Sequence, residues 1–224
     1  MRTEDLIDRL ARDADRVRPL PAPGRRAGVW FAVSAAFVTI VVLVMSPRPD
    51  LAEALRSSRF WVEQLAALLT AVLAAHAALA LSIPGTSRRI AITPLGPAAV
   101  WIGSQGVGCF VDVAARTGWD ISAEPECLAL IALTGSLPLF LLLPMVRLGV
   151  PVRPRLCVAL VALAAAALGN VGLRVFHAQD AALMILVWQT GSVALLTLVG
   201  WFFGPKILPG SPTRRKRRLG ALPS

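Results

Sequence analysis

The stretch LCVALVALAAAALGNVGLRV, residues 156–175, decides the fold of this chain. It carries one charged residue, Arg174, and it has about the ~20 residues that a helix needs to cross the hydrocarbon core of a bilayer. A backbone in lipid must satisfy its hydrogen bonds within itself, so an unbroken run of this length is predicted to be a helix and not a barrel strand. The chain of 224 residues is 56% hydrophobic and only 16% charged. This composition is typical of an integral membrane protein and not of a soluble domain.

Similar apolar runs occur along most of the chain. The predicted spans cover approximately residues 28–46, 60–82, 96–115, 127–146, 156–175 and 181–204. The sequence therefore predicts an all-α, polytopic membrane protein with six transmembrane helices. Its membrane domain is residues 28–204, followed by a basic tail, residues 205–224. Close packing against neighbouring helices is predicted for the third span from its small residues Ala99, Gly103, Gly106 and Gly108, and for the fifth span from Gly169 and Gly172.

Loop charge predicts the orientation. Most of the 23 Lys and Arg residues fall in the N-terminal segment, the second and fourth loops and the C-terminal tail. The positive-inside rule therefore places both termini in the cytoplasm. The first 27 residues lack the apolar run and small-residue cleavage site of a signal peptide, so the first span is expected to stay in the mature protein.

The N-terminal segment, residues 1–18, is predicted to be a short amphipathic helix. Leu6, Ile7 and Leu10 recur at helical spacing on one face, and Glu4 and Asp5 occupy the first turn, where the helix dipole favours negative charge. A helix this short is marginal alone in water, and it has no soluble core to cover its apolar face. We therefore expect it to dock onto a partner. Residues 19–27, rich in Pro and Arg, are expected to form an extended linker whose arginines lie at the lipid headgroups.

Polar residues inside spans favour an alternative function, a small transporter or channel subunit that uses Glu63, His76 and Asn170. These polar residues also have simpler explanations that involve no transport. Glu63 follows Arg59 by four residues, which predicts an ion pair on one helix face. His76 is expected to be neutral and hydrogen-bonded to a neighbouring helix, and interhelical hydrogen bonds are expected for Gln105, Asn170 and Gln189.

Enzyme activity is not expected. The chain has no visible nucleophile–base arrangement, metal-ligand cluster or phosphate-binding loop. No cofactor and no metal ion are therefore predicted.

The three cysteines and the basic tail suggest two further roles. Cys109 and Cys127 are predicted near the outer surface, where a disulfide is permitted, although both could equally be small buried apolar side chains. Cys157 is predicted at the inner end of its span and is expected to stay reduced. The run Arg214–Arg218 is expected to bind anionic lipid at the membrane surface, and no direct binding of nucleic acid is expected.

The order of these features resembles the NrsF family of bacterial inner-membrane anti-sigma factors. The resemblance rests on the Thr-Glu-Asp-Leu-Ile start at Thr3–Ile7, the Pro/Arg linker, six spans, the Ser-Ile-Pro-Gly sequence at Ser82–Gly85, and Val187 with Trp188. It implies a protein of the bacterial inner membrane whose cytoplasmic N-terminus holds an extracytoplasmic-function sigma factor and releases it on an envelope or oxidative signal.

The resemblance also suggests site residues. Glu4, Asp5, Leu6 and Ile7 match the family's acidic and apolar N-terminal motif, and Leu10 continues their apolar face. Cys109 and Cys127 match cysteines linked to redox sensing. A further cysteine of the family, after a histidine between the last two spans, is replaced here by Ala178. Any sensing by thiols is therefore expected to depend on Cys109 and Cys127.

Overall fold

The computed structural model describes residues 3–12, 20–114, 126–177 and 185–208, and within them the regular elements are all helical. The helices are α1 (Thr3–Arg12), α2 (Pro23–Met45), α3 (Leu51–Ala54), α4 (Ser58–Leu81), α5 (Leu95–Ala114), α6 (Glu126–Arg147), α7 (Pro154–Phe176) and α9 (Gly191–Ile207). A 3-10 helix, η1 (Arg88–Ile92), precedes α5, and a π-helical turn, η2 (Ile185–Thr190), leads into α9.

Five helical segments in the described part of the chain are long and apolar enough to cross a membrane. They are Pro23–Met45, Ser58–Leu81, Leu128–Arg147, Pro154–Phe176 and Val187–Ile207. Their outer faces expose large apolar side chains such as Val44, Phe140 and Phe202, which is the pattern of a surface solvated by lipid. The all-α membrane fold is therefore confirmed with five candidate spans. The predicted third span forms α5 but is not among the five.

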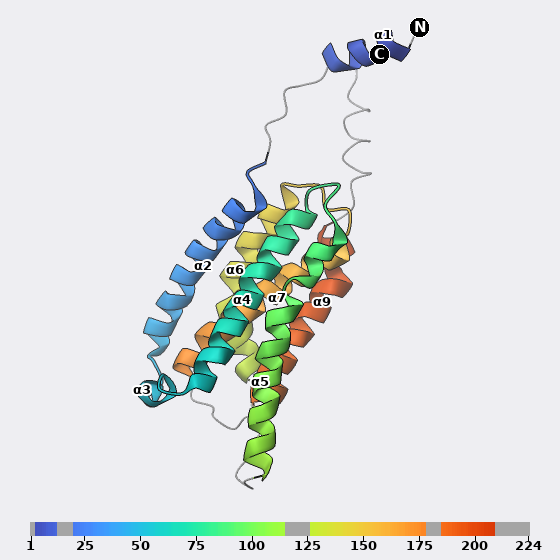
Figure 1. Ribbon diagram of the computed structural model, residues 1–224. Helices are drawn as coiled ribbons and strands as arrows, with labels where there is room; N and C mark the ends of the chain where they lie inside the picture. The colour runs from blue at the N-terminus through green and yellow to red at the C-terminus, as the bar shows by residue number, and fades with distance from the viewer. Residues whose placement is uncertain (1–2, 13–19, 115–125, 178–184, 209–224) are drawn as a thin grey trace.

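Helix α7 is the centre of the bundle and lies among α2, α4, α6 and α9 (Figure 1). Its small residues allow the neighbouring backbones to come close. A Cβ atom added to Gly169 would lie 2.8 Å from the Ile131 carbonyl oxygen of α6, and one added to Gly200 of α9 would lie 2.9 Å from the Ala162 Cβ of α7. Helix association in lipid depends on this kind of packing because burial away from water contributes little there.

The predicted close packing has different outcomes at the glycines of α7 and at Gly103 and Gly106 of α5. The close packing expected at Gly169 and Gly172 is confirmed, since an added Cβ at Gly172 would come within 2.6 Å of Val38 on α2. The same expectation for Gly103 and Gly106 is wrong, because an added Cβ there would meet nothing within 4 Å. Helix α5 packs against the bundle through another face, on which Trp101 and Gln105 are buried.

One end of the bundle, which we call the basic end, gathers the start of α2 and the ends of α4, α6 and α9. Arg26 donates a hydrogen bond to the Met145 carbonyl, and Arg147 Nη2 donates to the Ile207 carbonyl at 3.1 Å. The Val150 amide donates to the Ser82 carbonyl at 2.7 Å. The segments at this end, residues 20–27, 82–94, 147–155 and 204–208, contain no Asp or Glu. Their cations are Arg25, Arg26, Arg88, Arg89, Arg147, Arg153, Arg155 and Lys206.

The opposite end, which we call the mixed end, joins the end of α2 and the start of α4 to the end of α7. The Arg48 amide donates to the Val175 carbonyl at 3.0 Å, and Gln64 Nε2 donates to the Val171 carbonyl at 3.1 Å. Charges of both signs occur here: Arg48, Asp50, Glu53, Arg56, Arg59, Glu63 and Arg174. The distribution of Lys and Arg between the two ends follows the asymmetry seen in the sequence.

Two predicted boundaries were wrong. Helix α2 begins at Pro23, inside the predicted linker of residues 19–27, because proline is tolerated at the first helical position, where its missing N–H costs nothing. As a result Arg26 is buried against α6, and only Arg25 has the exposure expected of a headgroup residue. Helix α9 continues to Ile207 and so includes the first three residues of the predicted tail.

Candidate partner-docking helix and its membrane anchor

Helix α1 carries the predicted docking residues and is drawn apart from the bundle, beyond its basic end (Figure 1). Glu4 and Asp5 occupy its first turn and are exposed, and Ile7 is 59% exposed. The side chains of Leu6 and Leu10 are outside the described part of the structure, as are residues 13–19. The apolar face is therefore uncovered at Ile7, the one of its three predicted residues that can be assessed.

Glu63 lies in a buried ion network that joins two helices at the mixed end. Its carboxylate accepts from Arg59 Nε at 2.9 Å and from Arg174 Nη2 at 3.2 Å, and its side chain is only 3% exposed. The predicted pair with Arg59 is confirmed. Sequence reasoning missed the second partner, although Arg174 is the only charge in the apolar run of residues 156–175. Two guanidinium groups compensate the buried carboxylate, so transport is not needed to explain it.

Other polar residues of the spans give a mixed outcome. Thr190 Oγ1 donates to Gln105 Oε1 at 2.5 Å, which confirms an interhelical bond for Gln105. Gln189 is buried but its side-chain atoms have no partner among the described residues, and the same is true of Asn170 Oδ1. His76 is half-buried and makes no hydrogen bond to a described residue, so the predicted bond to a neighbouring helix was wrong there.

The Ser-Ile-Pro-Gly sequence forms the turn that leaves α4 and fixes it to the segment after α6. Ser82 Oγ donates to the Leu79 carbonyl at 2.6 Å, and its own carbonyl accepts from Val150. Gly149 approaches Ser82 so closely that no Cβ would fit, and Gly85 has a φ of 89°, which favours glycine. This motif is therefore structural at the basic end.

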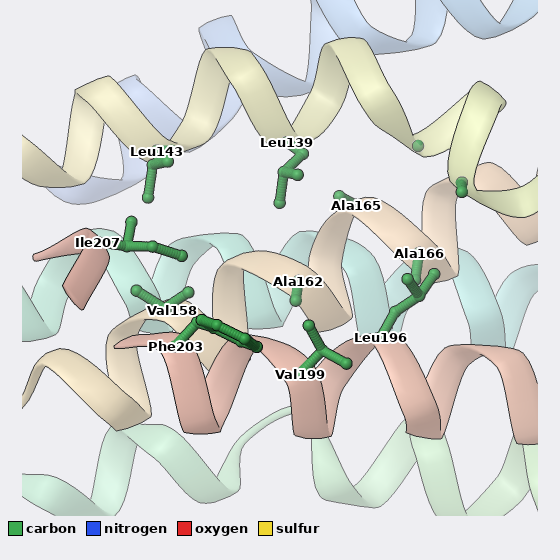
Figure 2. A pocket seen from close by; sticks show the side chains of 13 residues that line it. Leu139, Leu143, Val158, Ala162, Ala165, Ala166, Leu196, Val199, Phe203 and Ile207 are labelled. Carbon is green, nitrogen blue, oxygen red and sulfur yellow. The ribbon is translucent and has the colours of Figure 1, made fainter. Parts of the chain in front are cut away.

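An apolar pocket of about 270 Å³ lies between α6, α7 and α9. Figure 2 shows Leu139 and Leu143 of α6 pointing toward Val199 and Phe203 of α9 across Ala162 of α7. Its lining offers aliphatic and aromatic carbon and no ionisable side chain. Such a surface suits hydrocarbon and has no group that could perform chemistry.

The cysteines can be placed only in part. Cys157 is buried near the start of α7 and is unpaired. Cys109 lies in α5 and Cys127 is the second residue of α6, but both side chains are outside the described part of the structure. The basic run Arg214–Arg218 is also outside it. Within the described residues, no group of three His, Cys, Asp or Glu residues could hold a metal ion.

Comparison with known proteins identifies the family. A curated relative, the anti-sigma-F factor NrsF of Caulobacter vibrioides (strain NA1000 / CB15N), is 39% identical over 90 residues, which are 40% of this chain and 42% of that protein. The alignment thus spans about two fifths of the relative's length. No solved structure matches the chain. The family described as NrsF, negative regulator of sigma F, matches residues 10–209, nearly the whole chain. The protein therefore belongs to the NrsF family, a family of regulators and not of enzymes.

Proposed function

We propose that this protein is a membrane-bound anti-sigma factor that holds an extracytoplasmic-function sigma factor through α1. Membership of a family of negative regulators of sigma F supports the class of partner, as does the name of the relative. The observation that carries the docking role is α1 itself, with Ile7 exposed beside an acidic first turn and outside the contacts that build the bundle.

The chemistry of α1 supports docking of a helix into a groove. An apolar face formed by Leu6, Ile7 and Leu10 would enter the groove, as in other helix-in-groove complexes. Glu4 and Asp5 would face basic residues that the sigma factor otherwise turns toward DNA or polymerase. The acidic side chains would favour encounter with such a surface and fix the register on it.

The topology of the bundle supports six spans with both termini in the cytoplasm. Helix α2 begins at the basic end and α9 finishes there, so the chain crosses an even number of times between them. Helix α4 ends at the basic end, whereas α6 starts at the mixed end, and α5 is the described helix that makes this return. In Figure 1, α5 runs toward the end where α3 lies. The positive-inside rule then assigns the basic end to the cytoplasm.

The linker sets how far the captured partner can move. About ten residues, 13–22, separate α1 from α2, and a fully extended chain of that length spans at most roughly 36 Å. A docked sigma factor would therefore stay close to the membrane surface. On release, the fraction of this protein that holds a sigma factor must fall from nearly one to nearly zero. The signal must therefore change the free energy difference between the docked and released states by about 5 kcal/mol.

An oxidative signal is the trigger that we propose, through Cys109 and Cys127. Cys127 starts α6 at the mixed end, and Cys109 lies five residues before the end of α5, which leads to the same end. With the orientation above, both positions belong to the periplasmic half of the bundle, where a disulfide can form. A protein with both cysteines replaced by serine that still releases its partner normally on oxidant would exclude this trigger.

Binding of the co-encoded sigma factor to the full chain in lipid nanodiscs tests the docking role. Leu6→Asp is expected to weaken binding by tenfold to a hundredfold, because burial of a leucine contributes about 1.5–3 kcal/mol. Asp5→Arg is expected to weaken it as well. Leu20→Asp is the matched control, since it puts the same charge on an exposed linker leucine and should leave affinity unchanged.

A cellular measurement decides whether α1 is the inhibitory element. Deletion of residues 1–18 should raise transcription from the sigma factor's target promoter to the level seen without the whole protein. If the promoter stays as silent as before, the sigma factor is held elsewhere and the proposal is wrong.

A further inference from the structure

A second pocket, of about 410 Å³, lies at the basic end on the side of α9 away from the apolar pocket. Three arginines line it: Arg88 at the start of η1, Arg153 just before α7, and Arg155 in the first turn of α7. Trp201 and Pro205 of α9 complete the wall. Segments separated by more than sixty positions in the sequence thus bring their guanidinium groups to one cavity.

The pocket is a consequence of the close contact between α7 and α9. A Cβ added to Gly204 would lie 2.6 Å from the Arg155 Cα, so only a glycine lets α9 approach the start of α7 this closely. Trp201, one turn before Pro205 on α9, lines the same pocket as Arg155. The pocket is therefore built by the bundle and is not a chance gathering of surface side chains.

No carboxylate of the described residues pairs with the arginines of this pocket. The segments of the basic end contain no Asp or Glu, and none of the three arginines forms an ion pair with a described residue. Like charges held at one cavity repel each other, and a bound anion would relieve that repulsion. Phosphate is the anion that suits the planar, forked guanidinium group best.

We propose that this pocket binds the phosphate of an anionic phospholipid. A lipid is favoured over a free anion because the wall combines arginines with apolar surface. Trp201 is the kind of residue that lies at the membrane–water interface, and Phe202 next to it is 72% exposed on the flank of α9. Basic pockets between helices at this depth bind phospholipid headgroups. The inference needs a membrane-spanning bundle but does not depend on binding of a sigma factor.

Native mass spectrometry of the full chain in detergent, titrated with phosphatidylglycerol or with zwitterionic phosphatidylethanolamine, tests the site. The unmodified protein is expected to bind phosphatidylglycerol at least several-fold more tightly than phosphatidylethanolamine. The double variant Arg88→Gln with Arg155→Gln is expected to lose about tenfold in affinity for phosphatidylglycerol and little for phosphatidylethanolamine. Both side chains are exposed, so folding should survive, as checked by thermal unfolding.

The matched control removes the same charge at the same end but beside the apolar pocket. Arg147→Gln with Lys206→Gln should change the affinity for phosphatidylglycerol by less than twofold. An equal loss in both double variants would mean that only total charge matters and would overturn the site. Unchanged binding in the pocket variant would overturn it as well. Displacement of the lipid by millimolar inorganic phosphate would identify a free-phosphate site and reject the lipid.

Discussion

Helices α5 and α7 each contain two glycines three residues apart, yet the structure uses them in opposite ways. On α7, Gly169 and Gly172 face the backbone of α6 and a side chain of α2, and neither has room for a Cβ. On α5, Gly103 and Gly106 face open space. The spacing on the helix is the same, so the difference must come from what lies opposite.

The neighbours explain this difference. Helix α7 has four packed neighbours, and α6 offers it Gly135 and Thr134, which leave space for a close backbone approach. Thr134 Oγ1 also donates to the Gly169 carbonyl at 3.1 Å. Helix α5 packs mainly on α4, and its buried residues include Trp101 and Gln105. A glycine pair thus predicts close packing only when a second helix supplies a matching surface.

The largest expected effect concerns the ion network that holds the end of α7. Glu63→Ala would remove the buried carboxylate that accepts from Arg174 Nη2, and removing one partner of a buried pair costs about 3–5 kcal/mol of stability. We expect a marked fall in the thermal unfolding temperature in detergent, measured by circular dichroism.

The matched control for this variant is Arg59→Gln, which removes the exposed partner of Glu63 and leaves the Arg174 contact in place. This variant should lose no more than about 1 kcal/mol of unfolding free energy, as is usual when an exposed ion pair is removed. Equal losses in the two variants would mean that α7 is not fixed through Arg174.

The next effect tests the glycines of α7 directly. Gly169→Ala would place a methyl group 2.8 Å from both the Ile131 carbonyl oxygen and Thr134 Oγ1. Backbone cannot move aside cheaply, so we expect destabilisation of about 1–3 kcal/mol, the usual cost of overpacking. Chemical unfolding in mixed micelles measures it. Stability at or above that of the original protein would show that α6 and α7 are further apart than described.

These particular residues show how far the sequence alone could go. Hydropathy predicted the helical spans, and loop charge predicted the basic end, because both depend on local composition. The partner of Glu63 and the open space beside Gly103 depend on which helices become neighbours, which hydropathy does not encode. The start of α2 at Pro23 was missed because proline is compatible with both an extended linker and a first helical turn.

The candidate functional residues likewise include some that the sequence could predict and some that it could not. The acidic and apolar positions of α1 could be read from spacing, whereas the pocket of Arg88, Arg153 and Arg155 could not, since it needs two distant segments to meet. The name of the matching family suggests the class of partner that we propose, which physical reasoning on α1 alone did not identify.

A smaller effect on stability is expected at the hydrogen bond between Gln105 of α5 and Thr190. Gln105→Leu removes the acceptor of the Thr190 hydroxyl, and interhelical hydrogen bonds in membranes average about 0.6 kcal/mol. We expect a loss of that size in unfolding free energy. A double-mutant cycle with Thr190→Val isolates the pair, and a coupling energy near zero would contradict the contact.

The smallest expected effect belongs to the open glycines. Gly103→Ala and Gly106→Ala add a methyl group that meets nothing within 4 Å, and alanine favours the helix by at most about 1 kcal/mol over glycine. Unfolding free energy should therefore stay the same or rise slightly, in contrast to the loss expected for Gly169→Ala under identical conditions. A loss of similar size in α5 would mean that another surface, such as a second copy of the chain, covers this face in the membrane. The two glycine pairs would then have the same role, and the distinction between α5 and α7 would hold only for the isolated chain.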